Sequence, residues 1–364
     1  MLGLKKLDWY IIRKFLGTFF YTSLLFSLVS AAIDFSEKIN AFIENKAPIK
    51  EILFSYYLHF IPHINGLLWP LFSLISVIFF TSRLAANSEF LAMLNAGIPF
   101  RRLLRPYLIG AAVIVAIHLF GTLYAIPEGN KTKQEFESNV INKNKDKGKT
   151  NDVHLLLDKS SIAYIKYYRK RDSIGTDLRI EHYNKDTLDK LIVARNIIWK
   201  GEPNHWRIDG YSIRTFHGLN ESIILNDKGF IDTTLNLHPR DFVRYRNQKE
   251  MLTSSELYQY INDEKNRGLG ALREFEIELF RRYADSFSIF LLTIMGVAVS
   301  SRKSRGGMGK NLAIGIIAGA VFIILGRFSI AFTNGQYIPA VLGVWLPNIL
   351  FLFVTLWLIS RAQK

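Results

Sequence analysis

The sequence predicts an α-helical integral membrane protein with six transmembrane helices and one inserted all-β domain. Of its 364 residues, 49% are hydrophobic and only 21% are charged. The apolar residues are gathered into long blocks, whereas a soluble domain of this size interleaves them with polar ones. A long polar segment with short β-type runs separates the third block from the fourth. These observations indicate three helices, an extramembrane domain and three further helices.

A helix needs about 20 apolar residues to cross the hydrocarbon core of a bilayer. The six stretches that meet this condition are residues 11–33, 53–81, 103–126, 283–299, 312–332 and 338–360. The first follows basic residues, as in a signal peptide, but its apolar run is long and no A-x-A site with a clear mature start follows it. We therefore expect an uncleaved first span.

Lysine and arginine are concentrated in four regions that alternate correctly to share one side of the membrane. That side should be the cytoplasm, because cytoplasmic loops carry an excess of these residues. The net charge of +15 is therefore better explained by topology and anionic lipid headgroups than by nucleic acid. Both termini are predicted to be cytoplasmic. The basic residues concerned are Lys5, Lys6, Arg13, Lys14, Arg83, Arg101, Arg102, Arg105, Arg302, Lys303, Arg305, Lys310, Arg361 and Lys364.

A few charged residues lie within or beside the predicted spans. Arg327 lies deep in the fifth span, where an isolated arginine costs on the order of 3 kcal/mol. It should face another helix, a cavity or a lipid headgroup. Asp285 lies near the outer end of the fourth span, where interfacial water can solvate it. Arg281 and Arg282 stand at the same outer end and are an exception to the charge rule.

The loop between the second and third spans is predicted to contain a short amphipathic helix near residues 87–97. Such a helix can dock into a groove of a soluble partner. It can equally lie on the membrane interface, and the periodicity alone favours neither. The residues that open this helix and form its apolar stripe are Glu89, Phe90, Leu91 and Leu94.

The polar insertion covers residues 127–280, between membrane parts at 1–126 and 281–364. Runs rich in β-branched and aromatic residues are separated by turn signals, at residues 161–168, 190–199 and 205–216. Strands at this spacing are typical of a sandwich, a jelly roll or an open barrel. Near the end of the insertion, Thr253 and Glu256 fit a capping box, which predicts the start of a helix.

Sequence motifs for catalysis are absent. There is no cysteine, which excludes disulfides, thiol nucleophiles and Cys-type zinc sites. Residues 304–311 look a little like a phosphate loop, but Asn311 stands where Ser or Thr belongs. His59 and His63 lie one helical turn apart without a visible third metal ligand. We expect no cofactor, no metal and no ATP hydrolysis by this chain.

Four local sequences, in their order along the chain, resemble the LptF/LptG permease family of membrane subunits of the lipopolysaccharide-exporting ABC transporter. They are residues 7–14, 87–99, 278–283 and 346–350. The resemblance covers the whole chain, and the opening is more similar to the LptG branch.

This resemblance implies a multi-pass protein of the cell inner membrane with a periplasmic, jellyroll-like domain. It also implies a heterodimer with a paralogous permease subunit, a cytoplasmic ABC ATPase dimer and periplasmic bridge proteins. Lipopolysaccharide would be extracted from the membrane and passed to the bridge. The loop helix would be the coupling helix that the ATPase grips, with Glu89 as its acidic residue.

One position departs from the family. LptG-type members carry a lysine near the outer end of the first span that is thought to meet lipid phosphates, and Asp34 aligns there. The remaining candidates for headgroup contacts are Lys38, Lys46 and Arg327. Two other function classes stay open: a membrane-embedded enzyme acting on lipid or polysaccharide, and a scaffold or sensor with an outer ligand-binding domain.

Overall fold

The computed structural model describes residues 5–141, 151–169, 171–185, 187–218, 220–242, 247–267, 272–301 and 307–362. The chain divides into two compact units. The helical unit comprises Met1–Ile141, Lys249–Leu257 and Arg273–Lys364. The sheet unit comprises Asn142–Gln248 and Tyr258–Leu272. The loop at 302–306, which includes part of the phosphate-loop-like sequence and three of the basic residues, lies outside the described residues, as does Lys364.

Six helices are long and apolar enough to cross a membrane, which confirms the predicted number of spans. They cover Lys6–Glu44, Ile49–Ala86, Phe100–Ile141, Arg273–Ser300, Gly307–Asn334 and Ala340–Arg361. Several continue well beyond the predicted spans, and the third runs to Ile141 rather than ending at Ile126. Counting apolar residues locates only the part that lies in hydrocarbon, whereas the backbone hydrogen bonds continue through polar residues.

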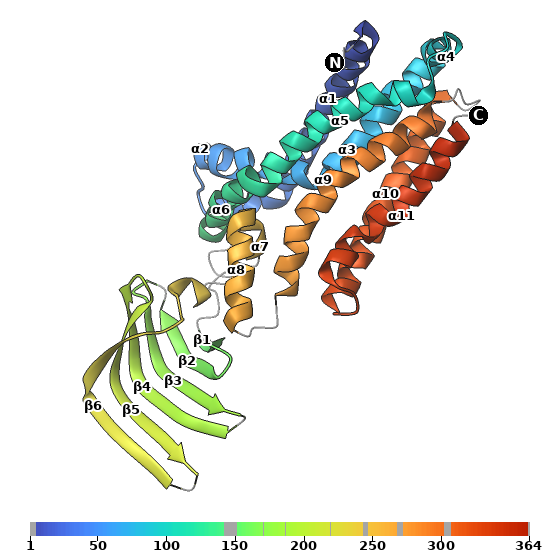
Figure 1. The fold of residues 1–364 in the computed structure, drawn as a ribbon. Coiled ribbons are helices and arrows are strands. Elements are labelled where there is room, and N and C mark those ends of the chain that lie inside the picture. The colour runs from blue at the N-terminus through green and yellow to red at the C-terminus, as the bar shows by residue number, and fades with distance from the viewer. Residues whose placement is uncertain are drawn as a thin grey trace. The chain divides into compact units, whose positions relative to one another are not determined.

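The helical unit contains these elements in chain order (Figure 1). They are α1 (Lys6–Glu44), α2 (Ile49–Glu51), the π-helical η1 (Ile52–Tyr57), α3 (Leu58–Ala86), α4 (Glu89–Asn95), α5 (Phe100–Phe120), the π-helical η2 (Gly121–Ala125), α6 (Ile126–Phe136), the π-helical η3 (Glu137–Ile141), α7 (Gln248–Met251), α9 (Arg273–Ser300), α10 (Gly307–Asn334) and α11 (Ala340–Ala362). The N-terminus, α4 and the C-terminus lie at the same end of this unit (Figure 1).

The central helix is α9, which carries the shortest predicted span. It packs against α3, α5, α10 and α11, and 67% of its apolar window is buried, against 17% for α1 and for α10. Enclosure by neighbours explains how it tolerates polar residues, because each finds a partner inside the bundle. Thr293 lies 2.7 Å from the hydroxyl of Ser73 on α3, and Ser286 lies 2.7 Å from Nδ1 of His118 on α5.

Close approach between α3 and α10 depends on two glycines of α10. A Cβ atom at Gly315 would meet the side chain of Ile78, and one at Gly319 would meet Leu71. Small residues at such positions let helix backbones approach within a membrane. The two glycines, four residues apart, therefore allow α10 to pack closely against α3.

The sheet unit contains one antiparallel sheet in which every strand pairs with its sequence neighbour, in the order β1 to β6. The strands are β1 (Asn151–Leu156), β2 (Ser161–Arg169), β3 (Ile174–Asn184), β4 (Thr187–Gly201), β5 (His205–His217) and β6 (Asn220–Thr234), and a 3-10 turn, η4 (Pro239–Phe242), follows them (Figure 1). The three β runs expected from the sequence fall in β2, β4 and β5. The inserted all-β domain is thereby confirmed as an up-and-down sheet, and a jellyroll stays a prediction.

One face of the sheet buries an apolar cluster. Burial alternates along β2, as expected for a strand with one covered face. Trp206 is fully buried, and its indole nitrogen donates a 2.8 Å hydrogen bond to the carbonyl of Leu237. The helix α8 (Ser254–Arg267) follows the sheet. Its capping box forms as predicted, because the amide of Thr253 donates to the Glu256 carboxylate at 2.8 Å.

Candidate functional site

A cavity of about 280 Å³ lies within the helical unit, between α3, α9, α10 and α11. Its wall is mainly apolar, with Leu67 and Leu71 from α3 and Phe322 from α10. Three charged residues join this wall, and they are Arg281, Asp285 and Arg327. An apolar hollow with few charged groups is suited to an amphipathic ligand with a negatively charged part.

Arg281 and Asp285 lie one turn apart on α9. Arg281 Nη2 lies 2.8 Å from Oε2 of Glu278, and its Nε lies 3.9 Å from Oδ2 of Asp285. The side chain keeps 23% of its surface exposed, so its charge is shared between protein carboxylates and the cavity. This i, i+4 pair is stabilised by helix geometry alone.

Arg282, the next residue along α9, points into the protein about 100° around the helix from Arg281 and is only 4% exposed. Its guanidinium donates hydrogen bonds to Oε1 of Glu278 at 3.3 Å and to the Ser254 hydroxyl at 2.9 Å. It also donates to the carbonyls of Leu252 and Lys249, at 2.9 and 3.2 Å. The N-terminal half of α9 is thus fastened to the segment that contains α7 and the start of α8.

A second cluster of polar residues lies beside Arg282. The amide of Asn130 on α6 donates a 3.0 Å hydrogen bond to the carbonyl of Glu250, and His63 Nε2 lies 3.9 Å from the Glu250 carboxylate. Burial raises the pKa of the Glu250 carboxyl, and the Glu278 carboxylate raises it further, while Arg281 lowers it. Among the described residues, no group of three His, Asp or Glu side chains could hold a metal ion.

Arg327 on α10 is exposed and reaches the cavity wall. No carboxylate of the described residues lies within ion-pair distance of it, so its charge is available to a ligand. The sequence predicted that this arginine would face a helix, a cavity or a headgroup, and the structure places it at a cavity.

The other two candidates for headgroup contacts do not line this cavity. Lys38 on α1 is partly exposed and already paired, with Nζ 2.8 Å from Asp34 Oδ1 and 3.5 Å from Glu137 Oε1, and in contact with the Tyr56 hydroxyl. Asp34 thus binds the neighbouring lysine. Lys46 is exposed in the turn after α1, with a left-handed φ of 49°.

The short loop helix forms as α4 and begins at Glu89, which accepts a 3.2 Å hydrogen bond from the Tyr10 hydroxyl of α1. Its apolar residues face two ways. Phe90 is 1% exposed and packs on Phe100, and Leu94 packs partly against the same core. Leu91 is 51% exposed. Phe90 therefore fastens α4 to the bundle, and Leu91 is the apolar residue that a partner could contact.

Sequence reasoning misses the place of Arg281 in the cavity, because the charge rule treats this residue only as an exception. Its spacing from Asp285 could have indicated it, since two opposite charges one turn apart on a span share a face. Arg282 occupies the adjacent face, about 100° around the helix, and serves the fold instead.

Comparison with known proteins gives a match across nearly the whole chain. Residues 9–361 match the family described as lipopolysaccharide export system permease LptF/LptG. The chain is 23% identical over 378 residues to the lipopolysaccharide export system permease protein LptG of Haemophilus influenzae, with 99% of each chain covered. It is 20% identical over 317 residues to the protein of that description from Escherichia coli K12, with 85% of each covered.

Replacing Arg282 with methionine should strongly destabilise the protein. The buried Glu278 carboxylate would lose a partner and two carbonyls would lose a donor, which costs about 3–5 kcal/mol for a buried pair. Arg281→Met is the matched control, because this side chain is partly exposed and Arg282 still pairs with Glu278; its cost should be about 1 kcal/mol or less. Denaturation of the purified chain in detergent measures both, and equal losses would contradict the anchoring role.

Proposed function

Because the chain belongs to the lipopolysaccharide export permease family LptF/LptG, we propose that it is a transmembrane permease subunit of an ABC exporter. In this role it extracts lipopolysaccharide from the inner membrane and passes it to a periplasmic bridge. Its six apolar helices make it a multi-pass membrane protein. Both curated relatives are LptG proteins, which favours the LptG role.

The observation that carries this proposal is the apolar cavity with Arg327 on its wall. Lipopolysaccharide joins acyl chains to phosphates, so it needs an apolar wall beside an uncompensated cation. A cavity of about 280 Å³ is too small for a lipid with several chains. One chain therefore supplies one wall, and a paralogous permease subunit completes the space. The largely exposed apolar face of α10 is a surface available to that second subunit.

We place the ATPase contact on α4. ATP hydrolysis occurs on a separate cytoplasmic ABC ATPase dimer, and this subunit transmits the motion. Leu91 offers an exposed apolar side chain for a groove in the partner, and Glu89 stands at the start of the helix. Since Phe90 packs into the bundle core, a displacement of α4 moves α3 and α5 with it. N- and C-termini lie on this cytoplasmic side in the proposed orientation.

The sheet unit receives the lipid in the periplasm. The outermost strand, β6, leaves the apolar side chains of Ile223, Ile224 and Leu225 exposed. An uncovered outer strand can pair with a strand of a bridge protein.

The lipid contact is tested with a photo-cross-linking amino acid at Leu67, which lines the cavity. We expect it to cross-link lipopolysaccharide in native membranes. Arg327→Gln should lower the yield of cross-linked lipid about tenfold, because one charge-assisted hydrogen bond is lost. Arg101→Gln, an exposed arginine of α5, should leave the yield unchanged. Equal yields in the two variants would contradict the role of Arg327, and turnover of lipid by the purified chain without an ATPase would favour an enzyme instead.

Charge reversal at α4 tests the ATPase contact. Glu89→Lys should lower the amount of ATPase that co-purifies, because it reverses a charge at the contact and breaks the bond to Tyr10. Glu135→Lys makes the same change at an exposed position of α6 and should leave the complex intact. An unchanged complex with Glu89→Lys would count against docking at this helix.

A further inference from the structure

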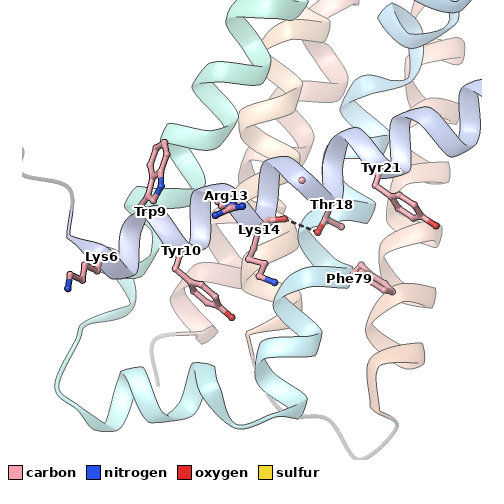
Figure 2. A pocket seen from close by; sticks show the side chains of 9 residues that line it. Lys6, Trp9, Tyr10, Arg13, Lys14, Thr18, Tyr21 and Phe79 are labelled. Atoms are coloured by element: carbon pink, nitrogen blue, oxygen red, sulfur yellow. Dashed lines mark hydrogen bonds between the residues drawn. The ribbon is translucent and has the colours of Figure 1, made fainter.

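A second concave surface lies on the outside of the helical unit, along α1 and one turn of α3. This groove has a volume of about 610 Å³ and shares no residue with the cavity described above. Figure 2 shows that Tyr10 and Lys14 project from α1 to the same side and that Phe79 reaches the groove from α3. The groove is at the end of the unit where the N-terminus lies (Figure 1).

The groove is strongly basic. Lys6, Arg13 and Lys14 line it, and no carboxylate does. Asp8 on the same helix is paired with Arg102, from which it accepts two 2.6 Å hydrogen bonds. Glu89 does not line the groove, but its carboxylate accepts a 3.2 Å hydrogen bond from the hydroxyl of Tyr10, which does. The three cations are therefore not neutralised by groups lining the groove, which is the charge pattern of a phosphate site.

Large aromatic side chains lie exposed between these cations. Trp9 and Tyr21 are 61% and 68% exposed, and Phe79 is 38% exposed. Tryptophan and tyrosine collect at the level of lipid headgroups, where one part of the ring is apolar and the other is wet. Long basic side chains reach toward headgroups from the same level.

An apolar surface continues from the groove along the same helix. Leu24, Leu25 and Leu28 of α1 are exposed, further along the span. A molecule whose phosphate lies among the cations would therefore have apolar surface beside it for acyl chains. A soluble phosphate would make no use of this surface.

From these features we propose that the groove binds the headgroup of an anionic phospholipid from the leaflet at the N-terminal end of the bundle. Basic pockets between transmembrane helices are known to hold such headgroups. The lipid phosphate lies beside Arg13 and Lys14, with Lys6 and Trp9 nearer the N-terminus. The ring of Tyr21 lies further along the span, where the acyl chains follow α1. The bound lipid is a lasting component of the surface, distinct from the transported lipid.

Binding is tested on the purified full chain in detergent, by native mass spectrometry with added phosphatidylglycerol or phosphatidylcholine. We expect phosphatidylglycerol to bind more tightly. The double variant Arg13→Gln/Lys14→Gln should weaken it about 25-fold, from roughly fivefold for each cation near a membrane surface. Arg101→Gln/Arg105→Gln removes the same charge from exposed positions of α5 and should change the affinity less than about twofold. Equal binding of the two lipids, or equal effects of the two double variants, would overturn the proposal.

The source of the phosphate is decided by competition. If the site takes a membrane lipid, glycerol 3-phosphate at the same concentration leaves phosphatidylglycerol bound. If glycerol 3-phosphate displaces it, the groove is a site for a soluble phosphate and the lipid proposal fails.

A second measurement does not depend on the charge variants. Brominated phosphatidylglycerol should quench the fluorescence of Trp9, seen as the difference between the unmodified chain and Trp9→Phe in vesicles. Brominated phosphatidylcholine should give a much smaller difference. No difference with either lipid would show that neither lies beside Trp9, and would overturn the proposal.

Discussion

The position of α9 in the helical unit depends on the groups that compensate the buried guanidinium charge of Arg282. A charge removed from water must be paired and fully hydrogen-bonded, or the fold loses several kcal/mol. Glu278, Ser254 and two backbone carbonyls meet this requirement. The same network sets the rotation of α9 about its axis. With Arg282 turned inward, Arg281 and Asp285 are directed to the cavity shared with α10, where Arg327 adds a second cation.

The spans could be predicted because hydrocarbon imposes a simple length and composition rule on each helix. The rule has no information about helix outside the hydrocarbon, so it ended the third span at Ile126 while the helix continues to Ile141. It also could not show that the shortest span, in α9, is the most enclosed. The strands are predictable from turns and β-branched runs, but these runs do not show which strands pair; in the structure each strand pairs with its sequence neighbour.

The site was predictable only in part. Arg327 is predictable as a site residue, because the free-energy cost of placing an arginine inside a membrane span indicates a functional position. Lys38 is a candidate because it lies near the end of the first span. That position does not show that Asp34 and Glu137 pair with its ammonium group. Phe90 was expected on the same stripe as Leu91, although adjacent residues on a helix diverge by about 100°. In the structure Phe90 is buried in the bundle, whereas Leu91 is exposed and available for contact.

In the proposed topology, the helices thread a bilayer and leave the sheet unit on the side of the membrane opposite α4. The absence of cysteine allows a direct test with single introduced cysteines and a membrane-impermeant maleimide. In spheroplasts with intact membranes, a cysteine at Lys228 in β6 should be labelled at once, and one at Asn95 in α4 only after the membrane is broken. Labelling of position 95 with protection of position 228 would contradict this topology.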